Sequence, residues 1–310
     1  MRFGLLTLLL AIGALGQEPA GLSIKVDVNL VNIAFIVRDA TGALDRSLTK
    51  GDFELFEDGV KQELQFFGKS GDLPLRLALV ADMSGSQDKF VRQHHRDIEK
   101  FLKVAITAKD NSMLVCFGNH LRVVSDFGSS VDGLMESLDA FQQGNQHFPE
   151  MEPDDTRSGG TALFDATYFT AREKLASATG ERKALILFSD GEDNSSAHDL
   201  MDAIEAAQSA DSVIYTVRYT EEKHGRLPAR ARYGIREMDR LAKETGGAAF
   251  DASTKNAGEA LAEVADELRS MYDVGYISTN PNRDGTFRKL TIRVKREGFT
   301  ARSKPGYFPR

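Results

Sequence analysis

A carboxylate and two hydroxyls stand at alternate positions directly after an apolar run near residue 80. The run Leu75–Ala81 ends in Asp82. Ser84 and Ser86 follow before a helical pattern begins. Short apolar runs of this kind suit a strand that is buried on both faces of a parallel sheet. The three side chains are therefore expected where the strand meets the next helix, the edge at which open α/β sheets bind ligands.

Two further stretches place oxygen-bearing side chains at expected strand-to-helix junctions, namely Thr161 in SGGT and Asp190 in SDGED. Mg²⁺ prefers octahedral oxygen coordination, keeps several waters and uses only one or two carboxylates. Two carboxylates and three hydroxyls would hold the ion without neutralising it, and would leave one position for an outside oxygen. The alternative is that Asp82 only caps the following helix. That reading leaves Thr161 and Asp190 unexplained.

Between residues 73 and 272, strand patterns alternate with helical patterns. Strands are predicted at 75–81, 112–117, 121–126, 183–189, 213–219 and 248–251. Helices are predicted at 89–108, 131–141, 162–178, 198–209, 234–245 and 257–272. This alternation predicts an α/β fold with a doubly wound, mostly parallel sheet covered on both faces. The turn Gly118-Asn119 predicts one antiparallel edge strand.

The two ends of the chain have β character without helices. In residues 22–72, apolar residues, mainly Val, Ile and Phe, alternate with polar ones in strand-like runs. Residues 273–310 return to β character. Neither segment has enough strands to stand alone. They are predicted to pair into one small β-sandwich, with an α/β domain at 73–272 inserted between them. The rival arrangement is two separate β caps.

The first residues have the layout of a secretory signal peptide. One basic residue precedes the apolar run Leu5–Ile12, and small residues precede Gln17. This layout predicts a signal peptide at 1–16 and a secreted or periplasmic protein; a buried N-terminal helix is the alternative. The run is short for a permanent membrane helix, and no later segment is apolar for long enough to cross a bilayer.

Charge and cysteine content narrow the function classes further. The formal net charge of −7 argues against a nucleic-acid partner, because binding to phosphates requires a basic face. Cys116 is the only cysteine, so no intrachain disulfide is possible, and its apolar neighbours indicate a core position.

Taken together, the motifs resemble those of a known family. Residues 73–272 look like a von Willebrand factor type A domain, and DMSGS at 82–86 matches that family's D-x-S-x-S metal-ion-dependent adhesion site. The family's loop threonine matches Thr161, and its second aspartate matches Asp190. The resemblance implies that the hydroxyls contact the ion directly, that the aspartates often act through water, and that an acidic side chain of a partner completes the coordination. The flanking segments resemble an exported, poorly characterised bacterial group related to this family.

Several nearby polar residues are predicted to have no direct role. Glu192, Asp193 and Asn194 are expected to be solvated loop residues. Asp165 is expected on a solvated helix surface rather than orienting the hydroxyls. Two loops, the acidic Gln142–Ser158 and the basic Thr220–Arg236, are expected to be flexible surface loops, and loops of this kind often carry recognition.

Three functions compete. The first is an exported adhesion module that captures an acidic group of a partner protein through Mg²⁺, with Mn²⁺ or Ca²⁺ as alternatives, held by Asp82, Ser84, Ser86, Thr161 and Asp190. The second is a structural or assembly protein of the envelope that uses its β unit, with the metal only stabilising loops. The third and most remote is a metal-assisted hydrolase. No base or nucleophile is placed beside the five ligands, so we predict no catalytic residues and no enzyme.

Overall fold

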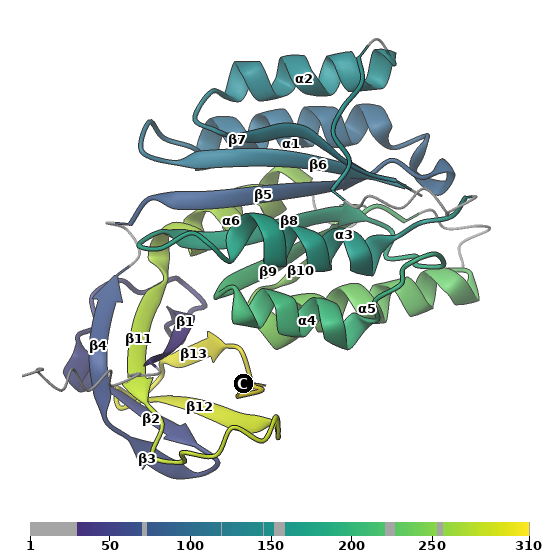
Figure 1. Cartoon of the computed structure of the whole chain (residues 1–310). Coiled ribbons are helices and arrows are strands. Elements are labelled where there is room, and N and C mark those ends of the chain that lie inside the picture. The colour runs from purple at the N-terminus through teal and green to yellow at the C-terminus, as the bar shows by residue number, and fades with distance from the viewer. Residues whose placement is uncertain are drawn as a thin grey trace, which may run out of the picture.

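The computed structural model describes residues 30–69, 73–118, 120–144, 146–151, 159–220, 227–252 and 257–309. The predicted signal peptide at 1–16 lies outside these residues. The described chain forms an α/β unit and a smaller β unit that lie side by side (Figure 1). Among the described helices, none is both long enough and apolar enough to cross a membrane.

A six-stranded sheet forms the centre of the α/β unit. Every neighbouring pair of strands is parallel except β6 and β7. Strand β8 is buried along its whole length, which explains its nearly continuous apolar sequence. In spatial order the strands are β10 (Ala249–Asp251), β9 (Ser212–Arg218), β8 (Arg182–Ser189), β5 (Leu75–Asp82), β6 (Asn111–Phe117) and β7 (Leu121–Gly128).

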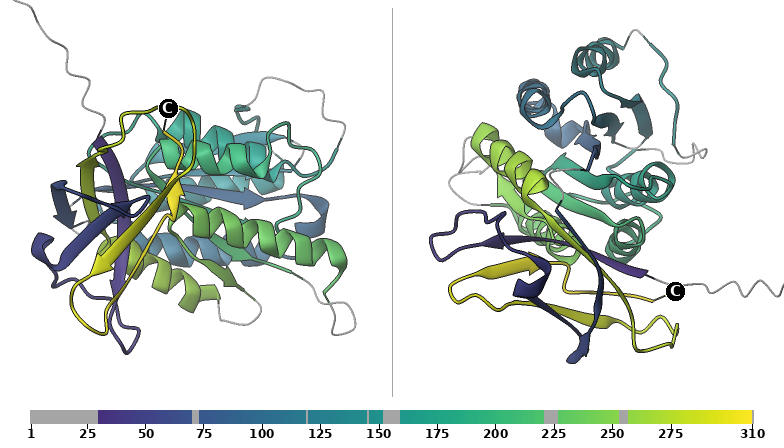
Figure 2. Two further views of the ribbon diagram at one scale, coloured as in Figure 1. Left: turned by 90° about the horizontal axis from the view of Figure 1, so that it is seen from below. Right: turned by 90° about the vertical axis from the view of Figure 1, so that its left-hand side faces the viewer.

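Helices cover both faces of this sheet (Figure 2). One face packs against α1 (Val91–Ala105), α2 (Val131–Gln143) and α6 (Ala257–Ser270). The other face packs against α3 (Leu163–Phe169), which continues as a π-helical stretch (Thr170–Leu175), and against α4 (Leu200–Ser209) and α5 (Ala229–Thr245). The predicted fold class, a doubly wound sheet with one antiparallel edge strand, is therefore confirmed.

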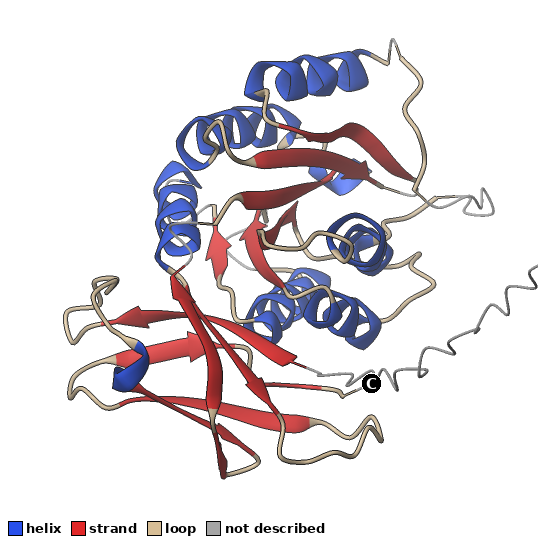
Figure 3. Ribbon diagram, turned by 60° about the vertical axis from the view of Figure 1, so that its left-hand side comes forward, coloured by secondary structure: helices blue, strands red, loops and turns tan. Residues whose placement is uncertain are grey.

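The β unit consists of two stacked four-stranded antiparallel sheets (Figure 3). Strands from the two ends of the chain pair within both sheets, since β1 lies between β11 and β13, and β12 pairs with β2. Residues from both ends also share one core, in which Phe35 and Tyr272 stack. The sheets contain β13 (Thr300–Ser303), β1 (Leu30–Arg38), β11 (Tyr272–Ile277) and β4 (Leu64–Lys69), and β14 (Gly306–Tyr307), β12 (Arg288–Val294), β2 (Phe53–Glu57) and β3 (Val60–Gln62). The domain boundaries at 73 and 272 stay predictions.

Ion pairs join the two units. Glu267 of α6 is fully buried and accepts hydrogen bonds from Arg38 of β1, at 2.7 Å, and from Arg302 of β13. Arg182, the first residue of β8, pairs with Asp273 of β11. These contacts are largely shielded from water, so they fix how the β unit sits against the amino ends of the parallel strands.

The prediction of a basic loop at Thr220–Arg236 is wrong in its second half. Helix α5 begins at Ala229. Its first turns pack through the small residues Ala231 and Gly234, whereas the large Tyr233 is 46% exposed. The buried face of these turns therefore has no large apolar side chain that would mark a helix in the sequence. The arginines that follow residue 228 therefore stand on a helix, with exposed side chains at Arg230, Arg232 and Arg236.

The described part of the acidic segment 142–158 is not a free surface loop either. Phe148 is 5% exposed and belongs to the core. Glu150 pairs with Arg122 of β7. The backbone around residue 150 also bonds to β7, because Val123 N donates to Pro149 O at 2.9 Å. Residues 145 and 152–158 lie outside the described residues.

Candidate metal centre

Adjacent parallel strands bring the two predicted aspartates together. Strands β5 and β8 pair along their length, with Ala81 opposite Phe188, so both end at the same edge of the sheet. The carboxylate of Asp82 accepts hydrogen bonds from Ser189 Oγ at 2.6 Å and from the backbone N–H of Ser84 at 2.9 Å. Asp82 is completely buried.

The two predicted serines connect Asp82 to Asp190. After Ser84, the backbone makes one 3₁₀ turn (Gly85–Gln87), which turns both hydroxyls to the same side. Ser84 Oγ and Ser86 Oγ lie 3.2 Å apart, and Ser86 Oγ donates to Asp190 Oδ2 at 2.8 Å. Four of the five predicted ligands therefore form one hydrogen-bonded group at the carboxyl ends of β5 and β8.

Thr161 lies at the same edge of the sheet. Its neighbour Ala162 donates its N–H to Gly118 O at 2.9 Å, and the Gly118 backbone packs against Ser84. The N–H of Thr161 donates to Asn194 Oδ1 at 2.8 Å, four residues after Asp190. Within the described residues its hydroxyl makes no hydrogen bond to the other four predicted ligands. The structure therefore places Thr161 between the loops that carry the other ligands, without a hydrogen bond from its hydroxyl to any of those ligands within the described residues.

Two glycines allow these loops to come close. Gly160 has φ +108°, and a Cβ there would lie 2.5 Å from Asn194 Oδ1. Gly191 has φ +82°, and a Cβ there would lie 2.3 Å from the carbonyl oxygen of Gly234 in α5. A side chain at either position would be strained and would push the neighbouring segment away.

The electrostatics of this edge are those of a site with unbalanced negative charge. Burial raises the pKa of Asp82 to about 7, and the nearby charge of Asp190 adds to this rise. Asp190 Oδ2 accepts hydrogen bonds only from neutral groups, the Ser86 hydroxyl and the Gln87 amide at 2.8 Å. Across the described segments, neither carboxylate forms an ion pair with a lysine or an arginine.

This donor set fits a hard divalent cation. Carboxylate and hydroxyl oxygens are the ligands that Mg²⁺ and Ca²⁺ take in proteins, and two carboxylates are enough for Mg²⁺. In the described part of the chain, no group of three or more His, Cys, Asp or Glu side chains could hold a metal ion. A metal at this edge would therefore need the hydroxyls as well as the carboxylates.

Three supporting residues were not recognised from the sequence. Ser189 holds Asp82, Gln87 donates both to Asp190 and to Tyr219 O at 3.4 Å, and Asn194 holds the Thr161 backbone. Ser189 and Gln87 directly adjoin predicted ligands in the sequence, which is the only signal that marked them.

Asp165 is not on a solvated helix surface, and that prediction is wrong. Its side chain is fully buried. It accepts hydrogen bonds from the backbone N–H groups of Ala197 at 2.8 Å and His198 at 2.9 Å, and it pairs with His198 Nδ1 at 2.7 Å. The loop after Asp190 folds back over the start of α3 and buries this carboxylate, a tertiary contact that local sequence does not encode.

The neighbouring loop residues Asp193 and Asn194 are likewise more than solvated. Asp193 Oδ2 accepts the N–H of Phe164 at 3.1 Å, which satisfies one of the free donors at the start of α3. Asn194 is exposed, but its Oδ1 binds Thr161. Both residues therefore fix the position of the Thr161 loop relative to Asp190.

No family description matches the chain, and no curated protein sequence matches it either. Several solved structures share part of its fold. An aerotolerance-related membrane protein from Bacteroides fragilis is 16% identical, with a TM-score of 0.48 over 63% of this chain and 98% of that chain. Proximal thread matrix protein 1 from the mussel byssus, solved with a zinc-occupied MIDAS motif, is 14% identical, with a TM-score of 0.48 over 67% of this chain and 48% of that chain.

The pilus adhesin SpaC from Lactobacillus rhamnosus GG is 11% identical, with a TM-score of 0.45 over 83% of this chain and 48% of that chain. At these identities and TM-scores, the likeness carries nothing about the metal, partner or activity of the present chain.

Proposed function

We propose that this protein is an exported binding module that captures an acidic group of a partner protein through a divalent cation, Mg²⁺ in the first instance. Asp82, Ser84, Ser86, Thr161 and Asp190 would hold the ion. The observation that supports this most strongly is the hydrogen-bonded group formed by residues of two separate loops, Ser84 and Ser86 on one and Asp190 on the other. A bound cation would supply positive charge to two buried carboxylates that otherwise lack it, and would attract an outside carboxylate.

The surface beside the site supports an acidic partner. Helix α5 packs directly on the Asp190 loop, since a Cβ at Gly234 would lie 2.5 Å from Asp190 O. Arg230, on the same helix, pairs with Glu192 at 2.7 Å and is 68% exposed. Exposed arginines at 232 and 236 extend the basic surface along α5. Such a surface steers negatively charged partners towards the candidate metal centre.

Capture of partners from the native source, with the chain immobilised, tests this function. We expect partners to bind in Mg²⁺ and to be released by EDTA, and we expect Asp190→Ala to retain at least tenfold less partner than wild type. Asp239→Ala is the matched control, because it removes an exposed carboxylate of α5. Binding that is indifferent to EDTA and to Asp190→Ala would refute the proposal.

The same variants separate the proposal from an assembly role of the β unit. If the metal only braces loops, Asp190→Ala should lower the melting temperature while partner binding persists. Under the proposal, partner binding is lost even at temperatures where circular dichroism shows the variant to be folded.

A further inference from the structure

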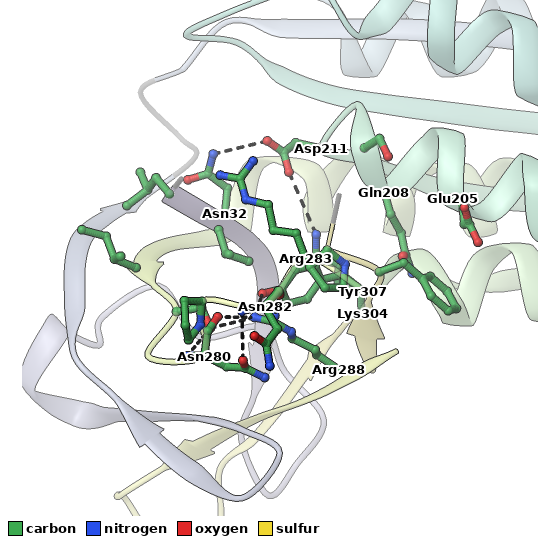
Figure 4. A pocket seen from close by; sticks show the side chains of 18 residues that line it. Asn32, Glu205, Gln208, Asp211, Asn280, Asn282, Arg283, Arg288, Lys304 and Tyr307 are labelled. Atoms are coloured by element: carbon green, nitrogen blue, oxygen red, sulfur yellow. Dashed lines mark hydrogen bonds and ion pairs between the residues drawn. The ribbon is translucent and has the colours of Figure 1, made fainter. Parts of the chain in front are cut away.

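A pocket of about 590 Å³ lies between the β unit and the α/β unit (Figure 4). Its walls come from the start of β1, the end of α4 with Asp211 beyond it, the loop after β11, and the last residues of the chain. Asp211 precedes β9, so the pocket lies at the amino ends of the parallel strands, opposite the edge that carries Asp82 and Asp190. The pocket is therefore distinct from the candidate metal centre. Its volume is that of sites for small molecules and short peptides.

One wall of the pocket is an unpaired edge of a strand. Strand β1 pairs with β11 over residues 30–35, but it pairs with β13 only over residues 35–38. In the described structure, residues 30–34 therefore have a strand on one side only. Three of them, Leu30, Val31 and Asn32, line the pocket.

The hydrogen bonds at the other end of β1 show which main-chain groups face this open side. Arg38 pairs with β13 on one side and with Leu44 on the other. Two backbone hydrogen bonds flank the Arg38–Leu44 pair on the side of β1 away from β13. Asp45 N donates to Val37 O, and Asp39 N donates to Ala43 O, both at 2.9 Å. Odd-numbered residues of β1 therefore turn their N–H and C=O groups away from β13. Since these directions alternate along a strand, the main chains of Leu30 and Asn32 face the open side.

A buried cation stands where β13 leaves the sheet. Lys304 follows the last residue of β13, and its side chain is 10% exposed. Among the described residues its ammonium forms an ion pair with Asp211, with Nζ and Oδ1 4.0 Å apart, and lies 6.0 Å from the centre of the Tyr307 ring, but it makes no hydrogen bond there. Burial lowers the pKa of Lys304. Three unused donors on a desolvated ammonium favour an anionic oxygen from outside the chain.

The opposite wall is held rigidly. Arg288 is 4% exposed, and it donates to Asn280 O at 2.9 Å and to Asn282 O. Behind it, Glu57 accepts from the same guanidinium at 3.1 Å. The loop that carries residues 280–282 is thereby fixed, so the pocket needs little ordering before it binds a ligand.

We propose that this pocket binds the C-terminal end of an extended peptide. The peptide main chain pairs with the open edge of β1 at Leu30 and Asn32 and runs parallel to β1. It lies on the side of β1 where β13 pairs further along the strand, at residues 35–38. Its terminal carboxylate accepts hydrogen bonds from Lys304. An apolar side chain of the peptide packs on Leu30 and Ile277, which lie opposite each other on β1 and β11 and are 41% and 46% exposed. The open strand edge favours a peptide over a lipid or a sugar acid, because neither of these offers a repeating main chain.

Two pooled libraries of random hexapeptides test the proposal with the full chain. One pool ends in a free carboxylate, and the other is identical but C-terminally amidated. Ultrafiltration followed by mass spectrometry measures how much of each pool the chain retains. We expect wild type to retain at least tenfold more of the carboxylate pool, in EDTA as well as in Mg²⁺, because the pocket does not depend on the metal edge. Equal retention of the two pools, or retention abolished by EDTA, would overturn the proposal.

Two variants locate the contacts. Lys304→Met should remove the preference for the carboxylate pool, while Lys289→Met, an exposed lysine of β12, should preserve it. Asn32→Pro removes one N–H from the open edge and should lower retention of the carboxylate pool at least fivefold, whereas Asn32→Ala should not. A preference for the carboxylate pool that survives Lys304→Met, or unchanged retention in a folded Asn32→Pro variant, would contradict the proposal. The comparison of the two pools on wild type needs no variant, so it decides even if a variant does not fold.

Discussion

Replacing Glu267 by glutamine is expected to lower the free energy of unfolding by about 3 kcal/mol. Glu267 is fully buried and faces two guanidiniums, those of Arg38 and Arg302. Glutamine keeps the shape of the side chain but removes its charge, so the two arginines lose their shared anionic partner at the junction of the two units. Their side chains are 28% and 35% exposed, which places the expected cost at the lower end of the range for a broken buried pair. Urea denaturation followed by circular dichroism measures the loss.

Glu263→Gln is the matched control for this prediction. Glu263 lies one turn earlier on α6 and binds the same Arg38 at the same distance of 2.7 Å, but its side chain is 33% exposed. An ion pair that water reaches contributes about 0.5 kcal/mol, so this variant should unfold nearly as wild type does. Equal losses in the two variants would show that burial of Glu267 does not set the strength of the junction.

Burial of His94 is expected to lower the free energy of unfolding as the pH falls. This side chain is fully buried in α1, and both ring nitrogens lack a hydrogen-bond partner within the described structure. The Tyr219 ring packs on it at 4.3 Å, and Tyr219 in turn donates to Asp97. Burial lowers the pKa of His94 from 6.5 to about 4. The folded chain therefore keeps this imidazole neutral in a pH range where the unfolded chain protonates it.

The sign of the effect follows from that difference in pKa. A histidine whose pKa is lowered by folding costs no stability above pH 6.5, and it costs progressively more as the pH falls towards 4. Between pH 7.5 and pH 5 the loss amounts to about 2 kcal/mol. His94→Leu removes this contribution, so the variant should gain about 2 kcal/mol over wild type between these two pH values.

Comparing wild type with His94→Leu also removes the contribution of Asp82 to the pH dependence of the unfolding free energy. Because the pKa of Asp82 is raised by folding, its protonation stabilises the folded chain as the pH falls, which opposes the effect of His94. Asp82 is present in both chains and cancels in the difference. Unfolding free energies that stay parallel from pH 7.5 to pH 5 would show that His94 is not held neutral.

The fold was predictable because its signals are local. The apolar run of β8, the turn between β6 and β7, and the alternation of strands with helices each depend on neighbouring residues in the sequence. The junction positions of Asp82 and Asp190 follow from the same pattern, since Asp82 directly follows an apolar run and Asp190 follows another one after Ser189. Parallel pairing then brings these two positions together without further information.

The features that sequence reasoning missed depend on contacts between distant segments. Asp165 is buried because the loop at 193–199 folds over it, and α5 starts early because small residues pack on the Asp190 loop. The open edge of β1 likewise depends on where β13, far away in the sequence, leaves the sheet. Such contacts bury residues whose chemical types indicate solvent exposure, so composition and periodicity mislead at these positions.

Calorimetric titration of Mg²⁺ into the purified chain tests the central proposal most directly. We expect one ion to bind per wild-type chain, and at least tenfold weaker binding in Asp190→Ala, with Asp239→Ala titrating as wild type. Heat that is the same for wild type and Asp190→Ala, or a wild-type chain that takes up no ion at millimolar Mg²⁺, Mn²⁺ or Ca²⁺, would show that this edge of the sheet is not a metal site.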